Sequence, residues 1–219
     1  MSSVRAPYHK LTEDIGQIAN EVTFEVEAPD IIVEHYVKRA ITQFCERSEF
    51  WQEDIGPARV TSSTNTIDIS SSRYSNIVQL KSIWVPGDDD NDYIELAKGN
   101  DYLGNTDWIY SQSSVDTISV FPHTELIGKD VIINAALKPI EYSGTFKFSE
   151  QILREYFDAI IAGTKGALYM IPNKMWTDIR LGSEHYSLFE LEANKALARG
   201  NRGFDRTPKR IHHKARDFY

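Results

Sequence analysis

The sequence has a single cysteine, Cys45, among 219 residues, so a disulfide framework within the chain is excluded. Cys45 falls within an apolar pattern of helical spacing, which favours a small buried side chain over a catalytic nucleophile. Apolar runs of about 18 residues, the length that crosses a bilayer, are missing. The polar start of the chain also lacks the apolar core of a signal peptide. We therefore expect a soluble protein without membrane association.

Motifs of the common enzyme classes are missing as well, including G-x-S-x-G, G-x-G-x-x-G, the Walker loop, H-E-x-x-H and C-x-x-C. Asp88, Asp90 and Asp92 have the spacing that begins a calcium loop, but Tyr93 stands where the loop needs glycine, which favours a solvated turn. Gly200 and Gly203 could cradle a phosphate, although a helix end followed by a turn explains them more simply. We expect no enzymatic activity, no cofactor and no metal.

Charge is unevenly distributed along the chain. The net charge is −8, yet residues 199–219 contain seven basic and two acidic residues. Without them the chain has 17 basic and 30 acidic residues, a net charge of −13. An acidic body that ends in a basic arm indicates a charged partner.

Residues 149–170 and 177–199 are predicted to form two amphipathic helices joined by a short connection. Apolar residues recur in the first at spacings of three and four, and Pro172 prevents its continuation. Thr177 is expected to cap the second helix, with Asp178 in its first turn. Trp176 is expected to be buried at the joint, with its indole N–H bonded to a nearby carbonyl.

The first of these helices has a second face without bulky side chains, formed by Ala159, Gly163, Gly166 and Ala167. Glycine inside a helix costs about 0.5–1 kcal/mol relative to alanine, so a close neighbour is expected on this face. We favour another helix of the same chain over a ligand or another subunit.

The N-terminal part predicts a partly ordered lead-in over residues 1–22, with one helical turn near 11–19. A third amphipathic helix should begin at Pro29 and Asp30 and continue through Trp51 to a break near Gly56 and Pro57. Residues 59–139 instead contain short β-like runs separated by turn residues, at 66–70, 77–85, 93–96, 108–111, 117–121 and 131–137.

These patterns predict an α+β fold, with a helical core of about three long amphipathic helices and a strand-rich insertion between the first and second. We divide the chain into a lead-in and first core helix (1–57), the strand-rich insertion (58–140), two core helices (141–200) and a basic C-terminal arm (201–219).

Five stretches and one downstream residue form a recognisable series: residues 28–54 (APDIIVEHYVKRAITQFCERSEFWQED), 120–122 (VFP), 136–139 (ALKP), 159–168 (AIIAGTKGAL) and 172–178 (PNKMWTD), followed by Phe189. With these stretches the chain resembles the head-to-tail adaptor (connector) proteins of tailed bacteriophages, in particular tail tubular protein A-like adaptors. The order and spacing of the stretches match the family more specifically than any one of them does. Ile179 and Gly182 depart from it, since such proteins often have proline and alanine there.

The resemblance implies a structural virion protein without enzymatic activity, located at the head-to-tail interface and assembled in the host cytoplasm. It implies a dodecameric ring of identical copies between the portal protein and a downstream tail or nozzle protein. DNA would pass through the channel without specific binding. An acidic body suits such a channel, because binding to phosphates is driven by Lys and Arg.

The basic arm is expected to dock on the portal or on a neighbouring subunit in such an assembly. The side chains expected to make this contact are Arg202, Phe204, Arg206, Lys209, Arg210, Ile211, Lys214, Arg216, Phe218 and Tyr219. The joint formed by Pro172, Trp176 and Thr177 is expected to be structural. One alternative remains a DNA-binding or DNA-packaging protein whose arm contacts phosphates. A virion-associated hydrolase is a weaker alternative, because the sequence offers no motif for it.

Overall fold

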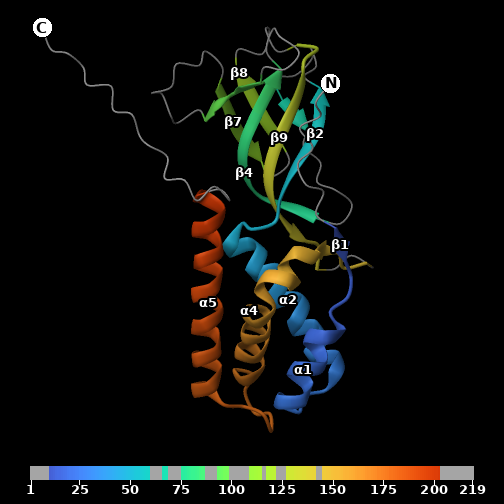
Figure 1. Cartoon of the computed structure of the whole chain (residues 1–219), viewed down its shortest axis with the longest axis vertical. Coiled ribbons are helices and arrows are strands. Elements are labelled where there is room, and N and C mark those ends of the chain that lie inside the picture. The colour runs from blue at the N-terminus through green and yellow to red at the C-terminus, as the bar shows by residue number, and fades with distance from the viewer. Residues whose placement is uncertain are drawn as a thin grey trace, which may run out of the picture.

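The fold belongs to the α+β class, as the sequence predicts, and is elongated, with helices at one end and strands at the other (Figure 1). It was obtained as a computed structural model that describes residues 10–59, 66–68, 75–86, 93–98, 109–114, 117–121, 127–141 and 145–202. The Asp88–Asp92 segment and residues 203–219 lie outside these ranges.

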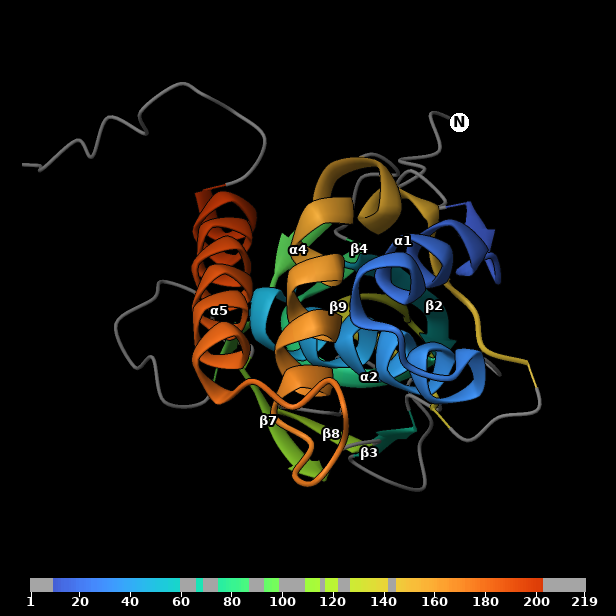
Figure 2. The ribbon, with the colours of Figure 1, turned by 90° about the horizontal axis from the view of Figure 1, so that it is seen from below.

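Four helices form what we call the helical layer: α1 (Gly16–Val26), α2 (Asp30–Ser48), α4 (Glu150–Tyr169) and α5 (Ile179–Arg202). Seen from below, α5 and α1 lie on opposite sides of α4, and α2 passes beneath α4 and α1 (Figure 2). The core of this layer surrounds Phe44 on α2, whose ring centroid is 4.8 Å from that of Tyr156 and 6.2 Å from that of Phe189.

The helix α1 corrects the expectation of a lead-in with a single helical turn. The helix has 11 residues and begins at Gly16. The amide of Gly16 donates a 2.9 Å hydrogen bond to Oδ1 of Asp14, just before the helix. Its inner face buries Ile18, Val22 and Val26. Its apolar residues recur at four-residue spacing, and burying them on the other helices stabilises a helix that is too short to be stable alone.

The helix α2 begins at Asp30 as predicted but does not extend to Trp51. Glu49 adopts a left-handed conformation with φ of 48°, and its amide donates to the Cys45 carbonyl at 3.0 Å, which ends the helix at Ser48. The chain then enters strand β2 (Gln52–Arg59). Gly56 and Pro57 do not end a helix; they lie where the pairing of β2 with β9 shifts register, between Ile55 and Ala58.

The strand-rich insertion forms two four-stranded sheets, in the orders β2-β9-β4-β5 and β3-β8-β7-β6. All pairings are antiparallel except β6 with β7. The remaining strands are β3 (Thr66–Asp68), β4 (Ser75–Pro86), β5 (Tyr93–Glu95), β6 (Ala97–Lys98), β7 (Ile109–Ser114), β8 (Thr117–Phe121) and β9 (Asp130–Pro139). A strand overlaps each of the six predicted runs. The strands β1 (Leu11–Thr12) and β10 (Phe148–Ser149) form a separate pair beside the helices.

We call the contact between α2 and the first sheet the neck. Trp51 fills it with only 1% of its surface exposed, and its carbonyl accepts a 2.7 Å hydrogen bond from the Leu137 amide on β9. Ion pairs between Lys81 and Glu49 and between Lys138 and Glu46 connect β4 and β9 to the end of α2. The neck therefore combines a filled apolar centre with partly exposed ion pairs.

Candidate functional site

The close contact between α4 and α5, which we call the seam, explains the face without bulky side chains. A Cβ placed on Gly163 would lie 2.6 Å from Cδ2 of Phe189, and one on Gly166 would lie 2.9 Å from the backbone nitrogen of Tyr186. Gly182 on α5 similarly approaches the Gly166 carbonyl. The expectation of a helix of the same chain on this face is therefore confirmed, and at these glycines the face is covered by α5.

The joint between α4 and α5 differs in detail from its prediction. The helix α4 ends at Tyr169, before Pro172, and α5 begins at Ile179. Asp178 caps α5, because its Oδ1 accepts a 3.0 Å hydrogen bond from the Leu181 amide. Thr177 is not the cap: its hydroxyl donates to the Ile171 carbonyl at 2.6 Å and accepts from the Lys174 amide at 2.9 Å. Thr177 thus closes the connecting loop.

Trp176 packs against the core but is only half-buried. Its indole Nε1 is buried and has no hydrogen-bond partner among the residues that the structure describes. The expected bond to a nearby carbonyl is therefore not made. Sequence position alone could not decide this, because the partner would have to come from packing.

A polar cluster connects three helices near the joint. Lys165 on α4 is buried and pairs with Glu25 on α1 at 2.5 Å. His185 on α5 stacks on Tyr169 with ring centroids 5.8 Å apart. Burial, and then the nearby Lys165, lower the pKa of His185, while burial raises the pKa of Tyr169. This arrangement holds α1, α4 and α5 together and favours a neutral imidazole.

Cys45 is buried on α2, as predicted for a small core side chain. Burial raises the pKa of its thiol, and the neighbouring Glu46 adds to this shift. The thiol therefore stays protonated at neutral pH, which disfavours nucleophilic chemistry. Over the described ranges, no three His, Cys, Asp or Glu side chains are grouped in a way that could hold a metal ion.

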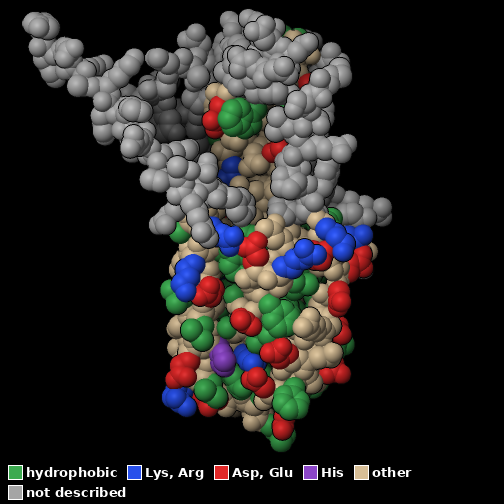
Figure 3. All heavy atoms as spheres, viewed as in Figure 1, with side chains coloured by type: hydrophobic (Ala, Val, Ile, Leu, Met, Phe, Trp, Pro, Cys, Tyr) green, Lys and Arg blue, Asp and Glu red, His purple; other side chains and the backbone are tan. Residues whose placement is uncertain are grey.

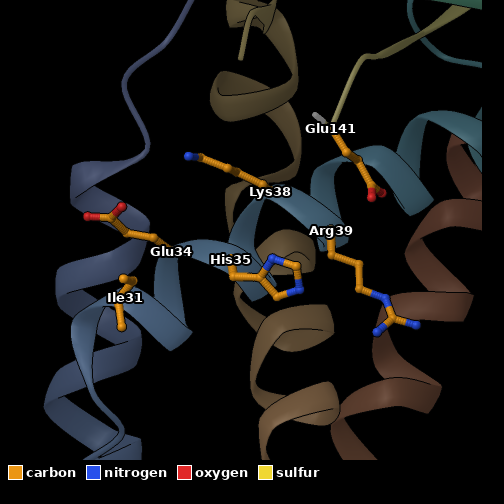
Figure 4. A pocket seen from close by; sticks show the side chains of 6 residues that line it. All are labelled: Ile31, Glu34, His35, Lys38, Arg39 and Glu141. Carbon is orange, nitrogen blue, oxygen red and sulfur yellow. The ribbon is translucent and has the colours of Figure 1, made fainter. Parts of the chain in front are cut away.

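A shallow depression of about 240 Å³ lies on the outer side of α2 (Figure 4). It is lined by Ile31, Glu34, His35, Lys38 and Arg39 of α2 and by Glu141, which follows β9. Its lining includes both acidic and basic side chains, and the ammonium group of Lys38 lies 6.0 Å from the centroid of the Phe146 ring. Its mixed charge and open form suit contact with another protein surface better than enclosure of a small ligand.

Exposed apolar side chains occur on each helix of the helical layer or at its end, including Ile31 of α2, which is 78% exposed. Phe24 on α1 is 89% exposed, and Leu188 and Leu191 on α5 are 54% and 50% exposed. Met170, Met175 and Ile179 form a further group at the α4–α5 joint. Sequence reasoning missed these residues, although Phe24 and Leu191 are out of phase with the apolar faces of their helices.

Only the first residues of the basic arm lie within the described ranges. The helix α5 continues through Gly200 to Arg202, and Arg199 pairs with Glu155 of α4 at 2.6 Å. The expected docking residues from Phe204 to Tyr219, and the side chain of Arg202, lie outside the described residues.

Comparison of the sequence with protein-family models and with curated proteins gives no match. In the described part of the chain, no helix combines the length and the apolar character needed to span a membrane.

Proposed function

We propose that this chain is a structural subunit of the head-to-tail junction of a tailed-bacteriophage virion. Copies of it form a ring, dodecameric as the resemblance implies, between the portal and the tail, around the channel through which DNA passes. The subunit has no enzymatic role and comprises a helical core from which the strand-rich insertion projects.

The observation that carries this proposal is that stretches matching the adaptor family, though distant in sequence, belong to one packed unit. Phe44 of the first stretch packs near Phe189, and Gly163 of the fourth contacts the same ring. Leu137 of the third stretch bonds to the backbone of Trp51. Scattered similarities would not be expected to converge on one core, so their convergence supports a shared architecture.

The distribution of surfaces also supports a ring. A closed ring of identical copies needs each subunit to offer two unlike faces. The edges of the helical layer at α1 and α5 lie on opposite sides of α4 and carry different exposed side chains (Figures 1 and 2). The acidic character of residues 1–198 suits a channel that DNA must cross without binding.

The basic arm is assigned to docking in this proposal. Its basic residues would pair with carboxylates of the portal or of a neighbouring subunit, with Phe218 and Tyr219 as apolar anchors. Truncation after Arg202 should leave the helical layer folded while weakening attachment to the portal. Circular dichroism and co-sedimentation with portal rings would measure the two effects.

A direct test mixes the purified chain with portal rings of the same phage and examines the product by electron microscopy and native mass measurement. We expect a second ring stacked on the portal, with a mass increase of a whole number of chains. If the chain remains monomeric and leaves portal rings unchanged, the proposal is wrong.

The basic arm specifically favours one alternative, a DNA-binding protein. That alternative predicts tight binding of duplex DNA by the isolated chain, with affinity falling steeply between two salt concentrations. Our proposal predicts weak binding to DNA and retention on portal rings.

A further inference from the structure

The outer face of α1, which we call the α1 edge, exposes a large apolar side chain that no described residue covers. Phe24 lies two positions from both Val22 and Val26, which are 0% and 2% exposed. Because residues two apart on a helix lie on nearly opposite sides, Phe24 points away from the core. Phe24 is 89% exposed and is therefore accessible to another protein surface.

The α1 edge is also acidic. Residues 11–37 contain seven acidic residues and neither Lys nor Arg. Glu13 and Glu25 form ion pairs with Lys147 and Lys165, but Glu21 and Glu27 form none with any described residue. Acidic side chains gather along this side of the helical layer (Figure 3). The edge therefore combines an uncovered aromatic ring with unpaired negative charge.

The outer face of α5, the α5 edge, also exposes apolar side chains and, unlike the α1 edge, carries basic side chains among its acidic ones. Leu191 lies two positions from Phe189 and Ala193, which are buried, so it points away from the core with Leu188 beside it. The helix itself, Ile179–Arg202, contains four basic and three acidic residues. The basic side chains of Arg180 and Lys195 form only exposed pairs with neighbours on the same helix. Such pairs contribute little and can change partners.

We propose that the α1 edge of one copy docks on the α5 edge of a second copy. Phe24 packs between Leu188 and Leu191, and Glu21 and Glu27 face the basic side chains of α5. This inference deepens the proposed function, on which it rests, by naming the surfaces through which copies meet.

The two edges cannot meet within one chain, since α4 lies between them (Figure 2). Two α1 edges would repel, because both are acidic. Docking of one edge on the other leaves a free α5 edge on the first copy and a free α1 edge on the second, so the same contact can repeat until a ring closes.

The test mixes two full-length variants that differ in mass, Asn20→Cys on the α1 edge and Ser187→Cys on the α5 edge. Both positions are exposed, whereas Cys45 is buried and does not compete. Under mild oxidation we expect the yield of the disulfide-linked mixed dimer to exceed the yield of either homodimer about tenfold. A matched control pairs Asn20→Cys with Asp158→Cys, an exposed position on α4 outside both edges. Equal yields for the two mixtures, or an excess of homodimers, would overturn the proposal.

A second measurement removes the aromatic anchor. Adding Phe24→Ser should lower the mixed-dimer yield about tenfold, as expected for a central interface anchor. Met175→Ser removes an apolar side chain that is 98% exposed but lies at the joint, so it should leave the yield unchanged. If the two substitutions act alike, the contact does not use Phe24.

The outcome separates this inference from the proposed function. Specific mixed dimers from a chain that does not join portal rings would refute the proposed function and leave the contact intact. Rings on the portal that form without this crosslink would refute the contact between the α1 and α5 edges and support the proposed function.

Discussion

The neck and the seam both connect large parts of this molecule, but they depend on opposite properties of side chains. The neck is filled by Trp51, the largest of the fully buried residues, with ion pairs around it. The seam depends on glycines, because any added Cβ would meet the backbone or the Phe189 ring. The neck is therefore destabilised when side-chain volume is removed, and the seam is destabilised when side-chain volume is added.

The largest effect is expected from Trp51→Ala. Removing a fully buried aromatic side chain leaves a cavity and should lower the free energy of unfolding by about 3–5 kcal/mol. Urea unfolding followed by circular dichroism measures this loss. The matched variant Trp176→Ala should cost about 1–3 kcal/mol, because Trp176 is only half-buried and its N–H has no partner to lose. Equal losses would show that the neck does not depend on its filled centre.

At the seam, Gly166→Ala should lower the free energy of unfolding by about 1–3 kcal/mol through overpacking, despite the higher helix propensity of alanine. The clash involves backbone atoms of α5, which cannot move away as a flexible side chain could. Gly200→Ala is the control, since its nearest neighbour would be at 3.5 Å, and it should leave stability unchanged or slightly raised. The same urea titrations test both variants, and a neutral Gly166→Ala would contradict the close approach.

A smaller effect is expected from Lys165→Met, which removes the buried cation near the seam. Glu25, its partner, has a side chain that is 48% exposed, so water can solvate the carboxylate that remains. The change in the free energy of unfolding should stay within about 1 kcal/mol. Thermal unfolding at low and high salt measures it, and a loss of several kcal/mol would mean that Glu25 is effectively buried.

The smallest effect concerns pH. Burial and Lys165 lower the pKa of His185 in the folded state, opposed by Glu25 and Glu184. The unfolded chain therefore binds a proton more readily, and the stabilising contribution is present above the unfolded pKa of about 6.5 and lost as pH falls below it. His185→Gln should reduce the fall in melting temperature between pH 7.5 and pH 5.5. A histidine variant with an unchanged pH profile would contradict this assignment.

Much of the fold could be predicted because local patterns agree with the packing. The β-branched runs form strands, as predicted, and the glycines of α4 contact another helix, α5. The lead-in was misjudged because α1 is stabilised by tertiary contacts, and β2 was missed because Gly56 and Pro57 resemble the end of a helix. Thr177 and Asp178 are adjacent residues that can both cap, and only the geometry of the loop decides between them.

The candidate site was less predictable. Phe24 and Leu191 could have been found from the phase of their helices, because each stands opposite a regular apolar face. The lack of a described partner for the Trp176 N–H could not be predicted, since it depends on which groups packing brings near. The expected docking side chains beyond Arg202 lie outside the described residues, so their assignment remains a prediction.

The insertion of the strands between α2 and α4 also has a consequence for synthesis on the ribosome. The apolar face of α2 is complete once residue 48 has been made, but α4 and α5, two of the helices packed on it, begin only at residues 150 and 179. About 100 residues must therefore be translated while this face lacks α4 and α5, a delay of roughly 5–20 s at usual rates of synthesis. We expect the nascent chain to depend on chaperones during this interval, and ribosome profiling of chaperone-bound nascent chains would detect the dependence.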